Sequence, residues 1–211
     1  MMLRNKTIIF YSRVLLFIAA FLGVYLEITK HGGFGMLLYY TVLSNLLVTL
    51  FTAYLLLKMR GDDNSWQNPG ILRLKGGVTM SIMITCVIYH FMLAPIATDF
   101  YRLENFLCHY IVPLWFLADT LLFDKNRQYK WFDPIVWTVL PLLYMGFAIL
   151  NGLVLKMNIP NAKDNPFPYF FLNANKYGWG FVFRWAATIF VAYMISGYLF
   201  YLVKNIKKSK K

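Results

Sequence analysis

The chain has 211 residues and a formal net charge of +12. Hydrophobic residues make up 59% of the chain and charged residues only 14%, whereas soluble domains carry about 25% charged residues. This composition excludes a soluble enzyme, a secreted disulfide scaffold and a disordered chain.

Six apolar stretches are each long enough, at roughly 17–25 residues, to cross about 30 Å of hydrocarbon as a helix. Backbone polar groups in lipid must be satisfied within the segment, and no alternating pattern indicates membrane strands. The sequence therefore predicts an all-α, polytopic membrane protein whose single domain is a bundle of six transmembrane helices. In chain order the predicted spans are residues 10–28, 36–57, 78–96, 105–123, 135–151 and 181–203.

The basic residues outside the spans are distributed unevenly. Fourteen of them would lie on the side that carries both termini, and five on the other side. Because cytoplasmic segments are enriched in Lys and Arg, both termini are predicted to be cytoplasmic, in a multi-pass protein of the cell membrane. The basic tail is predicted to contact anionic lipid head groups, and no nucleic-acid partner is expected. Its lysines are Lys204, Lys207, Lys208, Lys210 and Lys211.

Each predicted span places a polar side chain in the half nearer the outer surface. Such groups are costly in lipid and are functional candidates by default. Their similar depth predicts one shared cavity that opens outward, and helical spacing puts Ser44 and Asn45 on the same face of the second span as its threonine. The six residues are Glu27, Thr41, His90, His109, Asn151 and Arg184.

Two further charged residues, Arg13 and Asp119, lie in the inner halves of their spans. Both are about one turn from the predicted inner boundary, so we expect a structural salt bridge between them. Asp119 follows His109 by ten residues, about 15 Å along a helix, and cannot contact it directly. The sequence therefore offers no Ser-His-Asp triad.

The outer segment of residues 152–180 is long for a connection and contains three prolines. Segments of this length are often lids or binding elements. Its apolar part, Pro166 to Leu172, would be costly to leave in water. Two interpretations stay open: an aromatic anchor in the head-group layer, or a segment that folds back over the helices.

A threonine next to a histidine indicates a specific chemistry. A threonine hydroxyl becomes a nucleophile when a base within hydrogen-bond reach takes its proton, and histidine is the commonest base. Thr41 and His109 have matching depth on different helices, so they are the predicted nucleophile and base. Asn45, Arg184 and Ser44 are candidates for contacts with an oxyanion or with a substrate carboxylate.

Other interpretations of these residues stay open. Threonine in a membrane helix often bonds back to its own helix, and histidine can be an interhelical donor, so the cavity would then belong to a non-catalytic protein that binds a lipid or small molecule. Glu27, His90 and His109 are a lesser candidate for a catalytic zinc site. No cofactor or metal is expected for the threonine mechanism.

The residues around these positions resemble a known family. The segment Tyr39 to Asn45 is similar to the aromatic-Thr-x-x-Ser-Asn segment of the bacterial six-span family called Pr6Pr. His109 to Pro113, followed by Asp119 and then Leu122-Phe123, resembles the fourth-span signature of that family. Pro141 to Tyr144 and Pro166 to Asn173 also fit, so the resemblance covers nearly the whole chain.

This family is more distantly similar to the androgen-induced and androgen-dependent membrane proteins of animals. Those proteins are threonine hydrolases that cleave fatty acid esters of hydroxy fatty acids. The resemblance places their nucleophile at Thr41, their essential histidine at His109 and the acid that follows it at Asp119. It implies a lipid substrate that reaches the site from the bilayer, and the aromatic segment after Pro166 would cover the entry of the acyl chain.

Overall fold

The computed structural model describes residues 5–61, 64–97 and 99–206. Over these residues the fold is helical, and no strand is present in the described part of the chain. Six helices are long and apolar enough to cross a membrane, which confirms the predicted number of spans. They are Lys6–His31, Tyr40–Met59, Pro69–Ile96, Leu103–Phe123, Asp133–Leu155 and Trp179–Asn205. Of the predicted basic tail, residues 207–211 lie outside the described residues.

The six spans are built from α-helices that continue into other helix types near one end. The first two spans are α1 (Lys6–His31) and α2 (Tyr40–Met59), and the sixth is α9 (Trp179–Asn205). The third is α3 (Pro69–Ile88) with the π-helix η4 (Tyr89–Leu93) and the 3-10 turn η5 (Ala94–Ile96). The fourth is α4 (Leu103–Phe106), the π-helix η6 (Leu107–Ile111) and α5 (Val112–Phe123). The fifth is α6 (Asp133–Val136), α7 (Val139–Leu150) and the π-helix η7 (Asn151–Leu155).

The second span begins later than the apolar run predicted. Residues from 36 onward were expected to be spanning helix, but Gly33–Leu38 forms a 3-10 helix, η2, and Tyr39 is extended. Gly32 and Gly33 both have positive φ, and this backbone conformation ends α1 and turns the chain. Thr41 is therefore the second residue of α2 rather than a residue one turn inside a helix.

The third span begins earlier than predicted, at Pro69 instead of residue 78. Asn68 caps it by accepting a hydrogen bond from the Gly70 amide at 2.8 Å, and proline is favoured in the first turn. Arg73 and Lys75 fall between the second and third predicted spans, but they lie in α3 and are paired with the carboxylates of Asp133 and Asp124. A charged residue in a membrane helix is tolerated when it is paired in this way.

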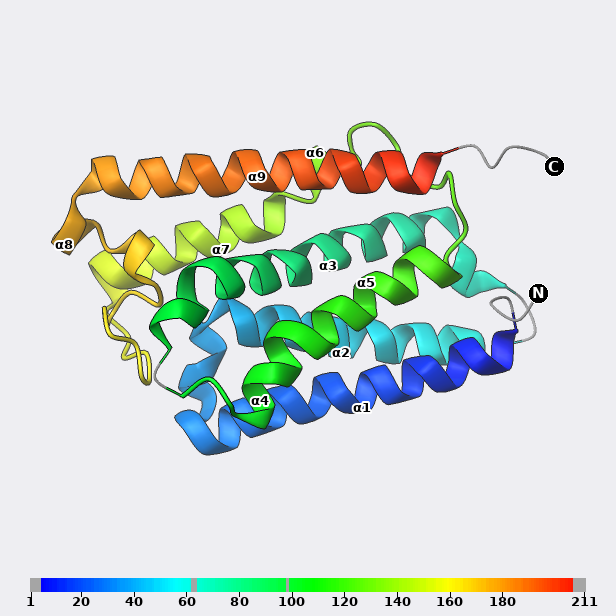
Figure 1. Cartoon of the computed structure of the whole chain (residues 1–211), viewed down its shortest axis with the longest axis horizontal. Helices are drawn as coiled ribbons and strands as arrows, with labels where there is room; N and C mark the ends of the chain where they lie inside the picture. The colour runs from blue at the N-terminus through cyan, green and yellow to red at the C-terminus, as the bar shows by residue number, and fades with distance from the viewer. Residues whose placement is uncertain (1–4, 62–63, 98, 207–211) are drawn as a thin grey trace.

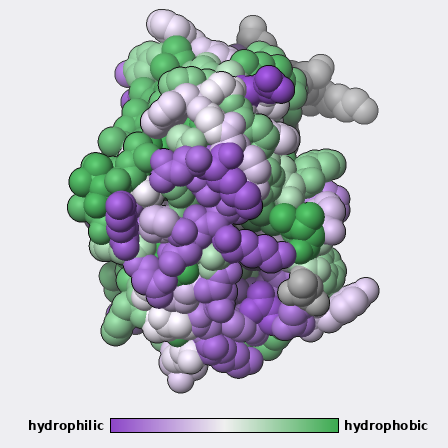
Figure 2. Space-filling model, turned by 90° about the vertical axis from the view of Figure 1, so that its left-hand side faces the viewer, coloured by the Kyte–Doolittle hydropathy of each residue, from purple (hydrophilic) through white to green (hydrophobic). Residues whose placement is uncertain are grey.

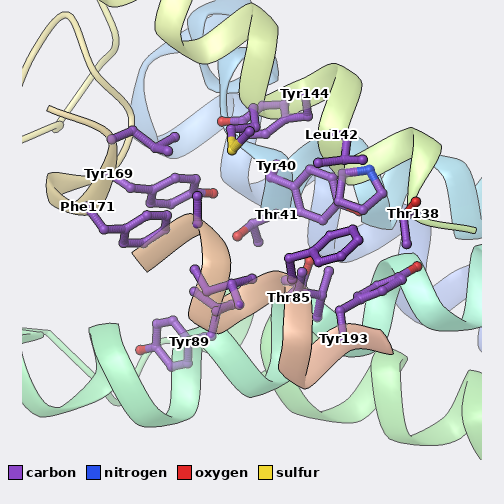
Figure 3. Close-up of a pocket in the computed structure, with 18 of the residues that line it drawn as sticks. Tyr40, Thr41, Thr85, Tyr89, Thr138, Leu142, Tyr144, Tyr169, Phe171 and Tyr193 are labelled. Carbon is purple, nitrogen blue, oxygen red and sulfur yellow. The ribbon is translucent and has the colours of Figure 1, made fainter. Parts of the chain in front are cut away.

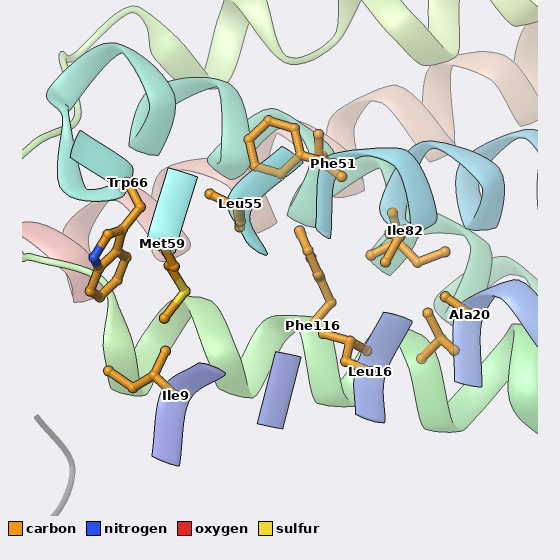
Figure 4. Packing of buried hydrophobic residues seen from close by; sticks show 12 residues of the cluster. Ile9, Leu16, Ala20, Phe51, Leu55, Met59, Trp66, Ile82 and Phe116 are labelled. Atoms are coloured by element: carbon orange, nitrogen blue, oxygen red, sulfur yellow. The ribbon is translucent and has the colours of Figure 1, made fainter. Parts of the chain in front are cut away.

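The first four spans pack around one apolar core. Figure 4 shows Leu16 of α1, Phe51 of α2 and Phe116 of α5 meeting in its centre, and the three are buried. Ile82 of α3 closes the same cluster. In Figure 1, α7 and α9 lie together along the side of α3, away from α1. The bundle is thus a four-helix core with a two-helix layer added to one side.

The two ends of the bundle differ. Figure 1 places the start of α1 and the end of α9 at one end, which we call the termini end, and α4 and α8 (Ala174–Tyr177) at the opposite end, the loop end. Figure 2 views the loop end, where hydrophilic residues gather across the middle of the face. A bundle that crosses a membrane is expected to have polar ends and apolar sides.

The outer segment folds back over the helices. Phe167 is 1% exposed and packs with Phe171 and Leu172 against Ala148 of α7. The Asn151 amide nitrogen donates to the carbonyls of Pro166 at 2.8 Å and Met157 at 3.2 Å. This packing decides between the two interpretations of the segment, because an anchor lying in the head-group layer would leave these side chains exposed.

A cluster of buried charges lies near the termini end. Arg13 Nη2 lies 3.0 Å from Asp119 Oδ2 and 3.1 Å from Asp124 Oδ1, which confirms the predicted pairing of Arg13 with Asp119. Lys75 contacts both carboxylates, its Nζ lying 2.8 Å from Asp124 Oδ2. Lys204 Nζ donates to the carbonyls of residues 120 and 124, at 2.9 Å each. We call these five residues the ionic cluster.

Candidate functional site

The helices change type where the candidate residues lie. Three spans contain a π-helical segment, η4, η6 and η7, and each follows or precedes the main α-helix toward the loop end. π-Helical turns are rare in proteins as a whole, but they are often found at functional sites. The extra residue in such a turn shifts the side chains out of the regular helical register. His109 is the third residue of η6. The sequence contained no signal for these segments.

Thr41 and His109 meet between α2 and η6. Thr41 Oγ1 lies 3.3 Å from His109 Nε2, as their matching depth predicted. His109 Nδ1 lies 3.0 Å from the carbonyl oxygen of Asn105. A carbonyl can only accept, so Nδ1 carries the proton and Nε2 presents its lone pair to the threonine hydroxyl. The arrangement therefore has the tautomer that a general base requires.

Packing holds the His109 ring in this orientation. The ring stacks on Tyr89, with centroids 3.7 Å apart and planes 23° apart. The ring is 8% exposed, and the residue before it, Cys108, is fully buried. Rotation of the imidazole would break both the stack and the Asn105 hydrogen bond, so the ring is held in one orientation.

Asn45 and Ser44 position the threonine backbone. Asn45 Nδ2 donates to the carbonyls of Thr41 at 2.8 Å and Cys108 at 3.0 Å, which ties α2 to η6. Ser44 Oγ donates to the Thr41 carbonyl at 3.1 Å and lies 2.8 Å from Thr85 Oγ1. Both amide hydrogens of Asn45 are thereby used. In this structure these residues support Thr41 from behind rather than present donors to a substrate.

A cavity lies on the other side of Thr41. Its walls come from α2, α3 and η4 on one side and from α7, α9 and the 3-10 helix η8 (Phe170–Leu172) on the other. Figure 3 shows its aromatic and aliphatic lining, with the Thr41 hydroxyl on the wall. The cavity volume is about 110 Å³, inside a space of about 820 Å³ that includes open solvent. Its lining is mostly apolar, which suits a hydrocarbon chain.

The remaining predicted residues lie apart from this pair. His90 is exposed, with Nδ1 3.2 Å from the Tyr110 hydroxyl, and Arg184 is exposed on α9 and is not among the residues lining the cavity. Asn151 anchors the outer segment, and Asp119 belongs to the ionic cluster. Glu27 is buried near the end of α1.

Glu27 lies beside a second charged group at the loop end. His31 Nε2 is 2.7 Å from Glu104 Oε1 and 2.8 Å from Arg102 Nη1, and Lys30 Nζ is 3.5 Å from Glu104 Oε2. This group joins the end of α1 to the start of α4. The residues proposed for zinc are not gathered: in the described ranges no three His, Cys, Asp or Glu side chains are placed to hold a metal ion.

Several residues of the site were not assigned from the sequence. Tyr89 and Asn105 hold the histidine, yet nothing in their local pattern distinguishes them from other polar or aromatic residues of a span. Tyr169 lines the cavity with Thr41. Tyr169 lies in the aromatic run after Pro166. That run predicted a segment that covers the acyl-chain entry, but it did not predict a hydroxyl group near Thr41.

Comparison with protein-family models, with curated proteins and with solved structures gave no match for this chain.

Proposed function

We propose that the protein is a membrane-embedded ester hydrolase in which Thr41 is the nucleophile and His109 the general base. One observation carries the proposal: the Thr41 hydroxyl lies 3.3 Å from the unprotonated nitrogen of a fixed histidine, on the wall of an apolar cavity. Catalytic hydrogen bonds are often long before substrate binds, so this distance suits a resting site.

The reaction has two halves. Thr41 Oγ1 attacks the ester carbonyl carbon while its proton passes to His109 Nε2, and the bond to the alkoxy oxygen then breaks. That oxygen takes the proton from His109 and leaves as the alcohol. In the second half, water gives a proton to His109 and attacks the acyl-threonine. The threonine oxygen leaves and takes the proton back, and the carboxylic acid is released.

The substrate class follows from the cavity and from the family resemblance. An apolar chamber within a transmembrane bundle favours a long acyl chain that enters from the bilayer. The more distant similarity to the androgen-induced and androgen-dependent membrane proteins favours fatty acid esters of hydroxy fatty acids. We further propose that the loop end faces outward and both termini lie in the cytoplasm, because Lys and Arg are enriched at the termini end.

A non-catalytic lipid-binding protein is the second candidate. It is favoured by the partner of His109 Nδ1, which is the backbone carbonyl of Asn105 rather than a carboxylate. A carboxylate would stabilise the imidazolium that forms during acyl transfer, and a carbonyl does so less strongly. The same cavity would then hold a lipid without cleaving it.

A fluorophosphonate probe separates the two candidates, because only an activated hydroxyl reacts with it. We expect purified wild type in detergent to be labelled, with the adduct on the peptide that contains Thr41. Thr41→Ala and His109→Ala should lose labelling, and Thr41→Ser should keep it. Thr188→Ala is the matched control, since Thr188 is an exposed threonine on α9 whose hydroxyl bonds to the Arg184 carbonyl at 2.9 Å.

Folded wild type that is neither labelled nor able to hydrolyse lipid esters would overturn the hydrolase proposal in favour of the binding protein. Labelling that persists in Thr41→Ala would assign the nucleophile to another residue.

A further inference from the structure

Ester hydrolysis needs a donor for the oxygen that becomes negative when the nucleophile attacks, and this donor is usually the largest catalytic contribution. The side chains expected to supply it are placed otherwise. Both amide hydrogens of Asn45 bond to backbone carbonyls, and Arg184 is exposed outside the cavity lining. A different group must face the substrate carbonyl beside Thr41.

Tyr169 is placed to be that group. It comes from the segment that folds back over the bundle and lines the cavity together with Thr41. Figure 3 shows its hydroxyl directed into the space in front of the Thr41 hydroxyl. Two other labelled tyrosines have occupied hydroxyls: Tyr144 donates to the Leu38 carbonyl at 2.8 Å and Tyr193 to the Trp137 carbonyl at 2.9 Å. The Tyr40 hydroxyl is buried without a hydrogen-bond partner in the described part of the chain.

Aromatic contacts fix the Tyr169 ring. Phe171 stacks on it with centroids 5.2 Å apart and planes 5° apart, and Tyr39 and Tyr144 contact it at 5.9 and 6.4 Å. The segment is tied to the bundle, since the Tyr39 hydroxyl donates to the Pro160 carbonyl at 2.7 Å. A ring held on three sides presents its hydroxyl in one direction and needs little reorganisation during the reaction.

The backbone at the start of α2 lies near this hydroxyl. The amides of Tyr40 and Thr41 precede the first intrahelical bond, from the Leu43 amide to the Tyr39 carbonyl. Burial raises the pKa of the Tyr169 phenol, and the nearby Thr41 side chain and the amides of Tyr40 and Thr41 oppose part of that rise. The phenol thus stays protonated at neutral pH and can donate a hydrogen bond.

We propose that Tyr169 is a catalytic residue: its hydroxyl donates a hydrogen bond to the substrate carbonyl oxygen, beside Thr41, and stabilises the negative charge that develops there. The proton stays on the phenol throughout, so the balance of the two half-reactions is unchanged. This inference rests on the proposed hydrolase function. It makes the segment after Pro166 part of the reaction centre as well as the wall of the cavity.

The test is Tyr169→Phe, which removes one oxygen atom and keeps the ring contacts. With p-nitrophenyl octanoate in detergent micelles we expect kcat to fall by about 10²-fold, the effect of removing one oxyanion donor, with KM changed less than threefold. Tyr177→Phe is the matched control and should keep the wild-type kcat, since Tyr177 is exposed on α8 and does not line the cavity. The thermal unfolding midpoint shows whether each variant is folded.

A second variant covers the case in which Tyr169→Phe does not fold. Replacement of Tyr169 by 3-fluorotyrosine keeps the shape and makes the hydroxyl more acidic. The alkaline limb of the kcat profile should move to lower pH, because the ionised phenol no longer donates. A merely structural tyrosine would leave this limb in place.

The failures of the two proposals are distinguishable. If wild type hydrolyses the ester, Thr41→Ala does not, and Tyr169→Phe keeps kcat within threefold, the role of Tyr169 is wrong and the hydrolase proposal stands. If Tyr169→Phe changes only KM, the catalytic role of Tyr169 is also wrong, and Tyr169 is a residue of the cavity wall. If wild type shows neither labelling nor hydrolysis, both proposals fail together.

Discussion

The two ends of the bundle use polar residues in opposite ways. Near the termini end, the ionic cluster places Arg13 and Lys75 against two carboxylates and Lys204 against two backbone carbonyls, with all five residues at most 6% exposed. At the loop end, Thr41 and His109 form a neutral pair beside an open cavity. Buried charges must be paired with other groups of the protein, whereas a neutral pair on a cavity wall can contact a ligand that enters the cavity. The first arrangement joins helices, and the second is free to do chemistry.

The largest effect is expected at the ionic cluster. Asp119→Asn removes the charge that pairs with Arg13 and Lys75 and leaves two buried cations to one remaining carboxylate, Asp124. Breaking a buried pair from one side costs about 3–5 kcal/mol, so we expect this variant to unfold far more readily in a detergent titration.

Asp99→Asn is the matched control for Asp119→Asn. The Asp99 side chain is 70% exposed and lies 3.5 Å from Arg102, and exposed pairs contribute about 0–1 kcal/mol. Equal stability of the two variants would contradict the separation of the two ends.

The next effect is on rate alone. His109→Gln removes the base while keeping a side chain that can bond to its neighbours, and the loss of general-base catalysis is expected to lower kcat by about 10²–10⁴-fold. Its stability should fall less than that of Asp119→Asn, because His109 makes neutral hydrogen bonds and a ring stack rather than a buried ion pair. A variant that loses stability rather than rate would show that this end is structural as well.

A smaller effect, on both stability and rate, is expected for a substitution of Asn45. Asn45→Ala removes two hydrogen bonds, to the carbonyls of Thr41 and Cys108, that hold α2 against η6. Side-chain hydrogen bonds in membrane bundles contribute about 0.6 kcal/mol each, so a loss of about 1 kcal/mol is expected, together with lower kcat because Thr41 is less well placed. Unchanged kcat with lowered stability would restrict Asn45 to packing.

The smallest effect is expected for Lys204→Met. Lys204 Nζ bonds to two backbone carbonyls rather than to a carboxylate oxygen, and its removal also removes the cost of burying a charge. We expect a loss of about 1 kcal/mol in the same detergent titration. A loss as large as that of Asp119→Asn would mean that Lys204 is an equal member of the charge balance.

The sequence predictions were confirmed where they depended only on the type of a residue and on its depth within a span. The six spans follow from apolar length, and Thr41 and His109 were matched by their distance from the span ends. Arg13 and Asp119 were paired for the same reason. Depth alone cannot say which helix faces which, so it placed Arg184 and His90 at the level of the site without showing that they are exposed.

The sequence by itself determined an all-helical membrane bundle, because only long apolar helices satisfy every backbone group in lipid. It also determined the residue types available for chemistry. The tertiary structure alone decided that Lys75 is an internal counter-charge, that π-helical turns orient His109, and that Tyr169 reaches Thr41. These depend on contacts between segments far apart in the chain, and helical periodicity carries no information about the partner that each face will meet.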